Sequence, residues 1–208
     1  GAVLNENDQF QNNSFRLRSQ VNLAAKLAIA REAAVLVKDG DSVLLDASST
    51  AYFFARALSE RSKLRVVTNG FEAAQELAQN SSNNVFLIGG VVNNDSSSVT
   101  GLLSERIIED LCVQKAFLSC SGFSLERGMT EVHFAEAQLK RKAIESSQQV
   151  NALIDSSKLG KEDLTPFARP NQITHLFTDS RLTSEWATKL KDAGVDFTIC
   201  EEELFSNK

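Results

Sequence analysis

The sequence alternates short apolar runs, rich in β-branched residues, with stretches that carry apolar residues at helical spacing. The runs span residues 42–46, 64–68, 85–88, 116–120, 150–155, 173–178 and 196–200. Most of them lack strict polar alternation, which is typical of parallel strands covered on both faces. Strands that alternate with helices predict an α/β domain with a mainly parallel sheet and helices on both faces.

Helices are predicted between these strands. The first is marked by apolar residues at helical spacing, namely Leu23, Leu27, Ala30, Ala34 and Val37. Further helices fit residues 51–58, 72–79, 102–111, 135–146 and 184–193. Residues 1–19 are rich in Asn and Gln with little periodicity, and predict a linker. Residues 20–208 are then expected to form one domain.

Composition limits the classes of protein to consider. The chain has 208 residues, is 42% hydrophobic, and has no apolar run long enough to span a bilayer. Its opening residues do not resemble a secretory signal, so we expect a cytoplasmic protein without a membrane partner. The net charge of -5 argues against nucleic-acid binding by this chain itself. Three cysteines without close pairing or metal-ligand spacing predict buried thiols, with no disulfide framework and no zinc site.

The stretch LLDASST, residues 44–50, places an acid and three hydroxyl residues between a strand and a helix. Ligands of open α/β sheets bind beyond the carboxyl ends of the strands, and a helix start offers free N–H groups to anions. Asp46 and the run from Ser48 to Thr50 could therefore form an anion cradle. The alternative is that Ser48 or Ser49 simply caps the helix.

Two other strand ends carry small or polar residues. Thr68, Asn69 and Gly70 follow one strand, and Gly89 and Gly90 follow the next. Each segment alone is a common turn or loop. Since the carboxyl ends of parallel strands share one edge, these segments are expected to converge near Asp46.

Several segments, in their order and spacing, resemble the effector-binding domain of DeoR-type transcriptional regulators. They are KLAIAREAA (26–34), VKDGDSVLLDASST (37–50), VVTNG (66–70), LIGG (87–90), TGLLSE (100–105), KAFLSCSG (115–122), EAQLK (136–140) and DSSK (155–158). The resemblance covers about residues 20–200. It implies a fold similar to ribose-5-phosphate isomerase and glucosamine-6-phosphate deaminase.

The resemblance also implies a function. Such a domain senses a phosphorylated sugar or related metabolite, needs no cofactor, and controls an N-terminal winged helix-turn-helix that binds operator DNA, usually as a repressor. Only about 20 residues precede the domain here, so that DNA-binding part is expected to be missing from this chain. A homodimer or homotetramer is implied as well.

Site residues follow from the same resemblance. Asp46 would accept sugar hydroxyls, while Ser48, Ser49 and Thr50 would bind phosphate, with Ser48 replacing the glycine that is usual in the family. Pocket-lining residues would be Thr68, Asn69, Gly89 and Gly90, and an adjoining loop would contain Gly122, Gly128 and Thr130.

Charged residues of two motifs complete the implied site. Lys140, in the same helix motif as Glu136, and Lys158 could supply positive charge to a phosphate. The alternatives are an exposed i,i+4 pair for Glu136 and Lys140, and a turn with a solvated charge for Asp155 and Lys158.

Two further hypotheses remain. Asp46, His133, Glu136 and Lys140 are residue types that a sugar-phosphate isomerase or deaminase would use for proton transfer. The related isomerases carry catalytic carboxylates after the strand that resembles KAFLSC, whereas residues 119–124 here contain none. We therefore expect binding without catalysis and without a metal. His133 is expected in a loop, and His175 in a strand as a core residue. A purely structural oligomerisation module would bind no metabolite.

Overall fold

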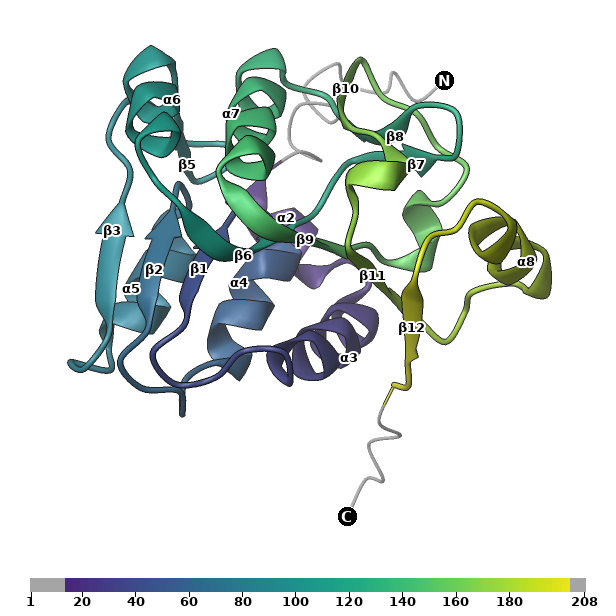
Figure 1. Ribbon diagram of the computed structural model, residues 1–208, viewed down its shortest axis with the longest axis horizontal. Coiled ribbons are helices and arrows are strands. Elements are labelled where there is room, and N and C mark those ends of the chain that lie inside the picture. Colours follow the sequence, from purple (N-terminus) through teal and green to yellow (C-terminus); the bar gives the residue numbers. More distant parts are fainter. Residues whose placement is uncertain (1–13, 203–208) are drawn as a thin grey trace, which may run out of the picture.

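Seven strands form one parallel sheet through the centre of the molecule, in the order β12-β11-β9-β6-β1-β2-β3 (Figure 1). The computed structural model describes residues 14–202. The strands are β1 (Ser42–Leu45), β2 (Arg65–Thr68), β3 (Asn84–Leu87), β6 (Val113–Leu118), β9 (Ser147–Leu153), β11 (His175–Asp179) and β12 (Phe197–Cys200). All six neighbouring pairs are parallel. The predicted strands and the predicted α/β class are confirmed.

Helices cover both faces of this sheet (Figure 1). One face carries α3 (Leu23–Ala34), α4 (Ser49–Ala57) and α5 (Phe71–Ala78), and the other carries α6 (Leu102–Glu109) and α7 (Phe134–Glu145). Helix α8 (Ser184–Asp192) joins β11 to β12. All were predicted within a few residues of their ends.

Consecutive apolar residues in the strands serve two separate cores. Phe117 packs under α4, where its ring lies 4.1 Å from that of Phe54, while the next residue, Leu118, belongs to the core beneath α6 and α7. Both side chains are fully buried. This two-sided burial explains why the strands lack polar alternation.

Two small antiparallel sheets were not predicted. Strands β7 (Gly122–Ser124), β8 (Gly128–Glu131) and β10 (Thr165–Ala168) form one, and β4 (Val91–Asn93) pairs with β5 (Ser98–Thr100) in the other. Gly128 is required at its position: its φ is +72°, and a Cβ there would lie 1.9 Å from the carbonyl oxygen of Ala168. Short 3-10 turns span η1 (Ser156–Lys158) and η2 (Pro170–Gln172).

The structure differs from expectation in two places. Helix α2 (Phe15–Gln20) lies within the segment expected to be a linker, capped by the side chain of Ser14; residues 1–13 lie outside the described part. Of the expected buried thiols, Cys120 and Cys200 are buried, but Cys112 is exposed because it follows α6 in the connection to β6. No helix in the described part is long and apolar enough to cross a membrane.

Candidate functional site

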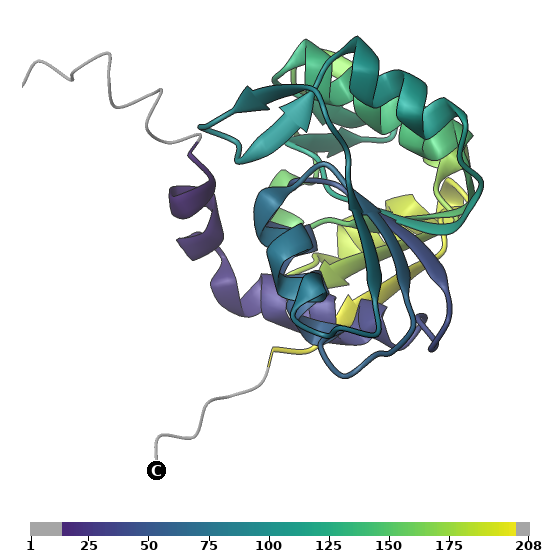
Figure 2. The ribbon, with the colours of Figure 1, turned by 90° about the vertical axis from the view of Figure 1, so that its left-hand side faces the viewer.

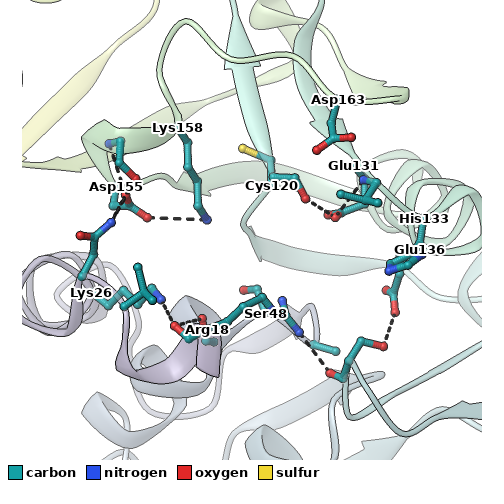
Figure 3. Close-up of a pocket in the computed structure, with 18 of the residues that line it drawn as sticks. Arg18, Lys26, Ser48, Cys120, Glu131, His133, Glu136, Asp155, Lys158 and Asp163 are labelled. Atoms are coloured by element: carbon teal, nitrogen blue, oxygen red, sulfur yellow. Dashed lines mark hydrogen bonds and ion pairs between the residues drawn. The ribbon is translucent and has the colours of Figure 1, made fainter. Parts of the chain in front are cut away.

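A cavity of about 350 Å³ opens at the carboxyl ends of the central strands (Figure 3). From β1 the chain proceeds to β2 and β3 on one side, and then returns to β6 on the other side of β1. Such a switch point leaves a crevice between diverging connections, where ligands of open α/β sheets bind. Residues after β1, β6 and β9 line it, namely Ala47, Ser48, Ser49, Cys120, Ser121, Asp155, Ser157 and Lys158.

The loop after β1 is held by its own polar groups. Asp46 accepts hydrogen bonds from the backbone N–H groups of Ser48 (3.0 Å) and Ser119 (2.8 Å). The hydroxyl of Ser48 caps α4 by accepting from the N–H of Ala51 at 3.1 Å. Ser48 has an ordinary extended conformation (φ -73°, ψ 153°), so this loop needs no glycine at that position. Ser48 therefore both caps α4 and lines the cavity.

A neighbouring turn is fixed by Gly70. A Cβ at Gly70 would lie 2.9 Å from the Cα of Ala47, so the start of α5 can approach the β1 loop only with glycine.

A buried ion cluster forms the floor of the cavity. The Nζ of Lys140 lies 3.1 Å from Asp46 and 2.6 Å from Glu131, and donates to the Ser119 carbonyl at 2.9 Å. Burial alone would lower the pKa of Lys140, but these carboxylates outweigh burial and raise it. Burial would raise the pKa of Glu131, but Lys140 and a hydrogen bond from Ser121 lower it to about 2. Lys140 is therefore already neutralised.

One end of the cavity carries an excess of positive charge. Lys26 and Lys158 lie together there (Figure 3), and Arg18 is also part of the lining. The nearby carboxylate of Asp155 lies 3.7 Å from Lys158 and accepts from Asn22 at 3.0 Å. Burial, together with the charge of Lys158 and, to a smaller extent, of Arg18, lowers the pKa of Lys26 to about 8, although Asp155 opposes the shift.

The opposite end is acidic and polar. Glu131, His133 and Glu136 lie there (Figure 3), with Asp163 nearby. Glu136 is buried and accepts from the hydroxyl of Ser98 and from Asn69 at 3.3 Å. It is not an exposed partner of Lys140, because both side chains are buried.

Some of the residues predicted for the site line this cavity and others do not. Those lining it are Ser48, Ser49, Glu136, Lys140 and Lys158. Asp46 and Asn69 lie behind them, bonded to Lys140 and Glu136. Away from the lining, Thr50 and Thr68 are fully buried, and Thr68 accepts from the N–H of Gly70.

The remaining predicted positions also lie outside the lining. The carbonyl of Gly89 accepts from Ser104 at the start of α6 (2.7 Å), and Gly90 lies against the same side chain. Gly122, Gly128 and Thr130 belong to the small antiparallel sheet, where Thr130 donates to the Gly122 carbonyl at 3.1 Å.

Several lining residues were not predicted. The segment of α2 and α3 contributes Arg18, Asn22 and Lys26, while Glu131 and Asp163 come from the small sheet and the loop before β10. One sequence feature could have identified Lys26 as a lining residue. It lies on the same helical face as the buried Ala30 and Ala33, where a lysine is unusual. His133 lies at the start of α7, as expected, and His175 lies in β11, but His175 is only half-buried beside Thr198 and is not part of the core. Within residues 14–202, no three His, Cys, Asp or Glu side chains are grouped to hold a metal ion.

Comparison with known proteins gives consistent matches. A family profile described as the DeoR C terminal sensor domain matches residues 21–180. The HTH-type transcriptional regulator GolR of Listeria innocua is 36% identical over 201 residues, which cover 97% of this chain and 79% of GolR. The HTH-type transcriptional repressor GlcR of Bacillus subtilis is 32% identical, and the match covers 98% of this chain and 78% of GlcR.

Solved structures show the fold alone. The eIF2B delta subunit of Chaetomium thermophilum superposes with a TM-score of 0.53 at 18% identity, covering 77% of this chain and 57% of that one. Ribose 5-phosphate isomerase A of Methanocaldococcus jannaschii superposes with a TM-score of 0.47 at 22% identity, covering 64% of this chain and 53% of that one. This chain therefore spans little more than half the length of either protein.

Proposed function

The chain belongs to the DeoR family of transcriptional regulators, as its C-terminal sensor domain, and from this premise we propose that the cavity binds a phosphorylated sugar or a similar phosphometabolite. The observation that carries the proposal is the separation of charge in the cavity. Lys26 and Lys158 lie at one end beside the carboxylate of Asp155, while Arg18, which donates to the Ser96 carbonyl, lines the wall between that end and Glu136. A phosphate dianion there would neutralise the excess charge.

The other end suits the sugar. Carboxylate oxygens of Glu131 and Asp163, together with the ring of His133, can hydrogen bond to hydroxyl groups. Ser48 and Ser49 lie on the lining between the loop and α4, whose first N–H groups have no partner within the helix. The proposed role of Asp46 is therefore to position Lys140 and the β1 loop, since its oxygens already accept two backbone bonds.

An isomerase or deaminase is the alternative, and it is disfavoured. The curated relatives are transcriptional regulators, and the chain is a non-catalytic relative of the isomerase-like fold. Glu131, with a pKa of about 2, is a weak base. Burial raises the pKa of Cys120 to about 12, so its thiol stays protonated at neutral pH and is a poor nucleophile.

We further propose that occupancy of the cavity controls operator binding by a helix-turn-helix on the N-terminal side, within the cytoplasm. Helix α2 precedes the domain and contributes Arg18 to the lining, followed by Asn22 and Lys26. A bound phosphate would contact the segment that leads toward the N-terminus, so the ligand can alter how that segment is held.

Calorimetry tests the proposal. Ribose 5-phosphate, hexose 6-phosphates and glycerol phosphate should be compared with their unphosphorylated counterparts. The best phosphorylated compound should bind at least ten-fold more tightly than its counterpart. Lys158→Gln should weaken it by a factor of about 10 to 100, because a hydrogen bond to a charged group contributes about 1.5–3 kcal/mol. Lys191→Gln, which removes an equal charge from α8 outside the cavity lining, should have no effect. Equal affinities for phosphorylated and free sugars would contradict the proposal.

A further inference from the structure

Exposed apolar side chains occur at the β3 edge of the main sheet, on the hairpin that follows it and on α6. They come from β3, β4 and α6: Phe86, Leu87, Val91, Val92, Leu102, Leu103 and Ile107, each 38–76% exposed. We call this set the β3 edge patch. Figure 2 turns this side of the molecule toward the viewer, with the β4–β5 hairpin and α6 next to the end of β3. Together these side chains expose roughly several hundred Å² of apolar surface, the upper range for a monomeric protein.

Strand β3 is accessible on three sides. Phe86 and Leu87 point to opposite faces of the sheet and are 54% and 42% exposed, although α5 contacts the strand and Val85 packs against the core. The third side is the hydrogen-bonding edge, since β3 is the last strand in the order. Asn84 and Ile88 donate to carbonyls of the β2 segment (2.8 and 2.9 Å). Because backbone groups alternate in direction, those of Val85 and Leu87 point outward.

The edge has none of the usual protection against pairing. Residues 84–94, NVFLIGGVVNN, contain no charged residue and no proline. Exposed edge strands are normally blocked by charges, prolines or bulges, and an unblocked one pairs with another strand.

We propose that the β3 edge patch is the interface with a second copy of this chain, in which the two β3 strands pair antiparallel about a twofold axis and join two sheets into one. In this register Val85 of each copy faces Leu87 of the other, and the two residues exchange their outward hydrogen bonds. Phe86 meets the Phe86 of the second copy on the axis as a non-hydrogen-bonded pair, with Cα atoms about 4.5 Å apart. The arrangement is self-complementary, as a twofold interface requires.

Charges at the rim support a second copy as the occupant. Helix α6 borders the patch and carries Arg106 between Glu105 and Glu109. Arg106 forms no ion pair within residues 14–202. When two copies of α6 pack antiparallel across the axis, Arg106 of one copy approaches Glu105 of the other, since Glu109 is already paired with Lys142. The size also fits, because a standard interface buries about 800 Å² per partner including its polar rim.

Sedimentation equilibrium of the 208-residue chain tests the interface. The unchanged chain should be a dimer or a larger even assembly at micromolar concentration. Phe86→Lys and Leu87→Lys should each halve the mass of the assembly or reduce it to the monomer, with circular dichroism melts used to select folded variants. Val35→Lys, at a 70% exposed apolar position at the end of α3, is the matched control and should not change the mass. A monomeric unchanged chain, or folded edge variants with unchanged mass, would overturn the proposal.

Disulfide trapping tests the register even where a lysine variant fails to fold. In a Cys112→Ser background, the F86C substitution should give a disulfide-linked dimer on mild oxidation, because the predicted Cα separation falls within disulfide range. V35C, at the control position, should remain unlinked. If the protein is a dimer but the F86C variant does not cross-link faster than the V35C variant, the two copies meet at another surface. The proposal would then fail.

Discussion

Two buried lysines of the cavity differ in what they can do. Lys140 has Asp46 and Glu131 beside it, and its pKa is raised despite burial. Lys26 donates to the backbone carbonyl of Arg18, and burial and the charge of Lys158 lower its pKa. Lys140 is thus a fixed structural charge, whereas Lys26 gains most from an arriving anion.

Ligand affinity should therefore depend on pH through Lys26. Its pKa in the free protein is about 8, and a bound phosphate favours the protonated form. Affinity should be constant from pH 7 to nearly 8 and fall by up to about ten-fold per unit above that, while the phosphate stays a dianion because its second pKa is about 6. Calorimetry from pH 7 to 9.5 measures this, and Lys26→Met should abolish the slope. The same slope in Lys26→Met would exclude Lys26 as its source.

Mutations of the hydroxyl residues at the start of α4 should have different effects on stability. Ser48→Ala removes the helix cap and should lower the free energy of unfolding by about 0.5–2 kcal/mol. Thr50→Val removes a buried hydroxyl that has no hydrogen-bond partner in the described structure, so stability should be unchanged or higher. It should also leave sugar-phosphate affinity within about two-fold, because Thr50 does not line the cavity. Urea titrations and calorimetry measure both effects. A ten-fold loss of affinity in Thr50→Val would return Thr50 to the binding site.

At the scale of elements, α2 is the least firmly held part of the cavity wall. It has no buried residue. The N–H of Phe15 donates to Asp95 (2.7 Å), the Arg18 side chain donates to Ser96 (3.4 Å), and the Ser49 hydroxyl donates to the Arg18 carbonyl (3.3 Å). Helices held by so few contacts open easily, so α2 is the element that a ligand can stabilise most.

Hydrogen exchange should detect this. A bound sugar phosphate should slow amide exchange in α2 and in the first turn of α3, because Arg18 and Lys26 contact the phosphate in the proposed complex. Helix α8, which does not contribute to the cavity lining, should exchange at an unchanged rate. If a ligand binds and the exchange rates of α2 do not change, then ligand binding does not affect the N-terminal segment. That result would contradict the proposed coupling.

At the scale of the whole molecule, the ion cluster of Asp46, Lys140 and Glu131 joins three elements. Asp46 follows β1 of the main sheet, Lys140 is on α7, and Glu131 ends β8 of the small sheet. Removing one partner from a buried cluster leaves charge without compensation.

Glu131→Gln should lower the free energy of unfolding at pH 7 by about 2–3 kcal/mol, less than for a fully isolated charge because Asp46 remains. The pKa of Glu131 is lowered from 4.5 to about 2 in the folded state, so its contribution is complete above about pH 4.5 and is lost as pH falls toward 2. Urea titrations at pH 7, 4.5 and 3 measure this, with Glu162→Gln on the neighbouring loop as control. An equal acid sensitivity in Glu131→Gln and the unchanged chain would contradict this role.

Local sequence patterns were enough to predict the main sheet, its helices and the edge where the cavity lies. Strand and helix patterns are local, and the parallel arrangement follows from their alternation, which is why the loop after β1 could be placed near a site in advance. The family resemblance, and not the local pattern, placed Lys158 there. The identity of the side chains that line the cavity depended on long-range contacts. Arg18, Lys26 and Glu131 reach it from a short helix, from a helix face and from a small antiparallel sheet whose pairing joins distant segments. Tertiary packing also placed Asp46 in an ion pair with Lys140 and buried Thr50 in the core. The positions of α5 and α6 left the outer edge of β3 open. These outcomes depend on contacts between residues far apart in the chain, which no local pattern contains.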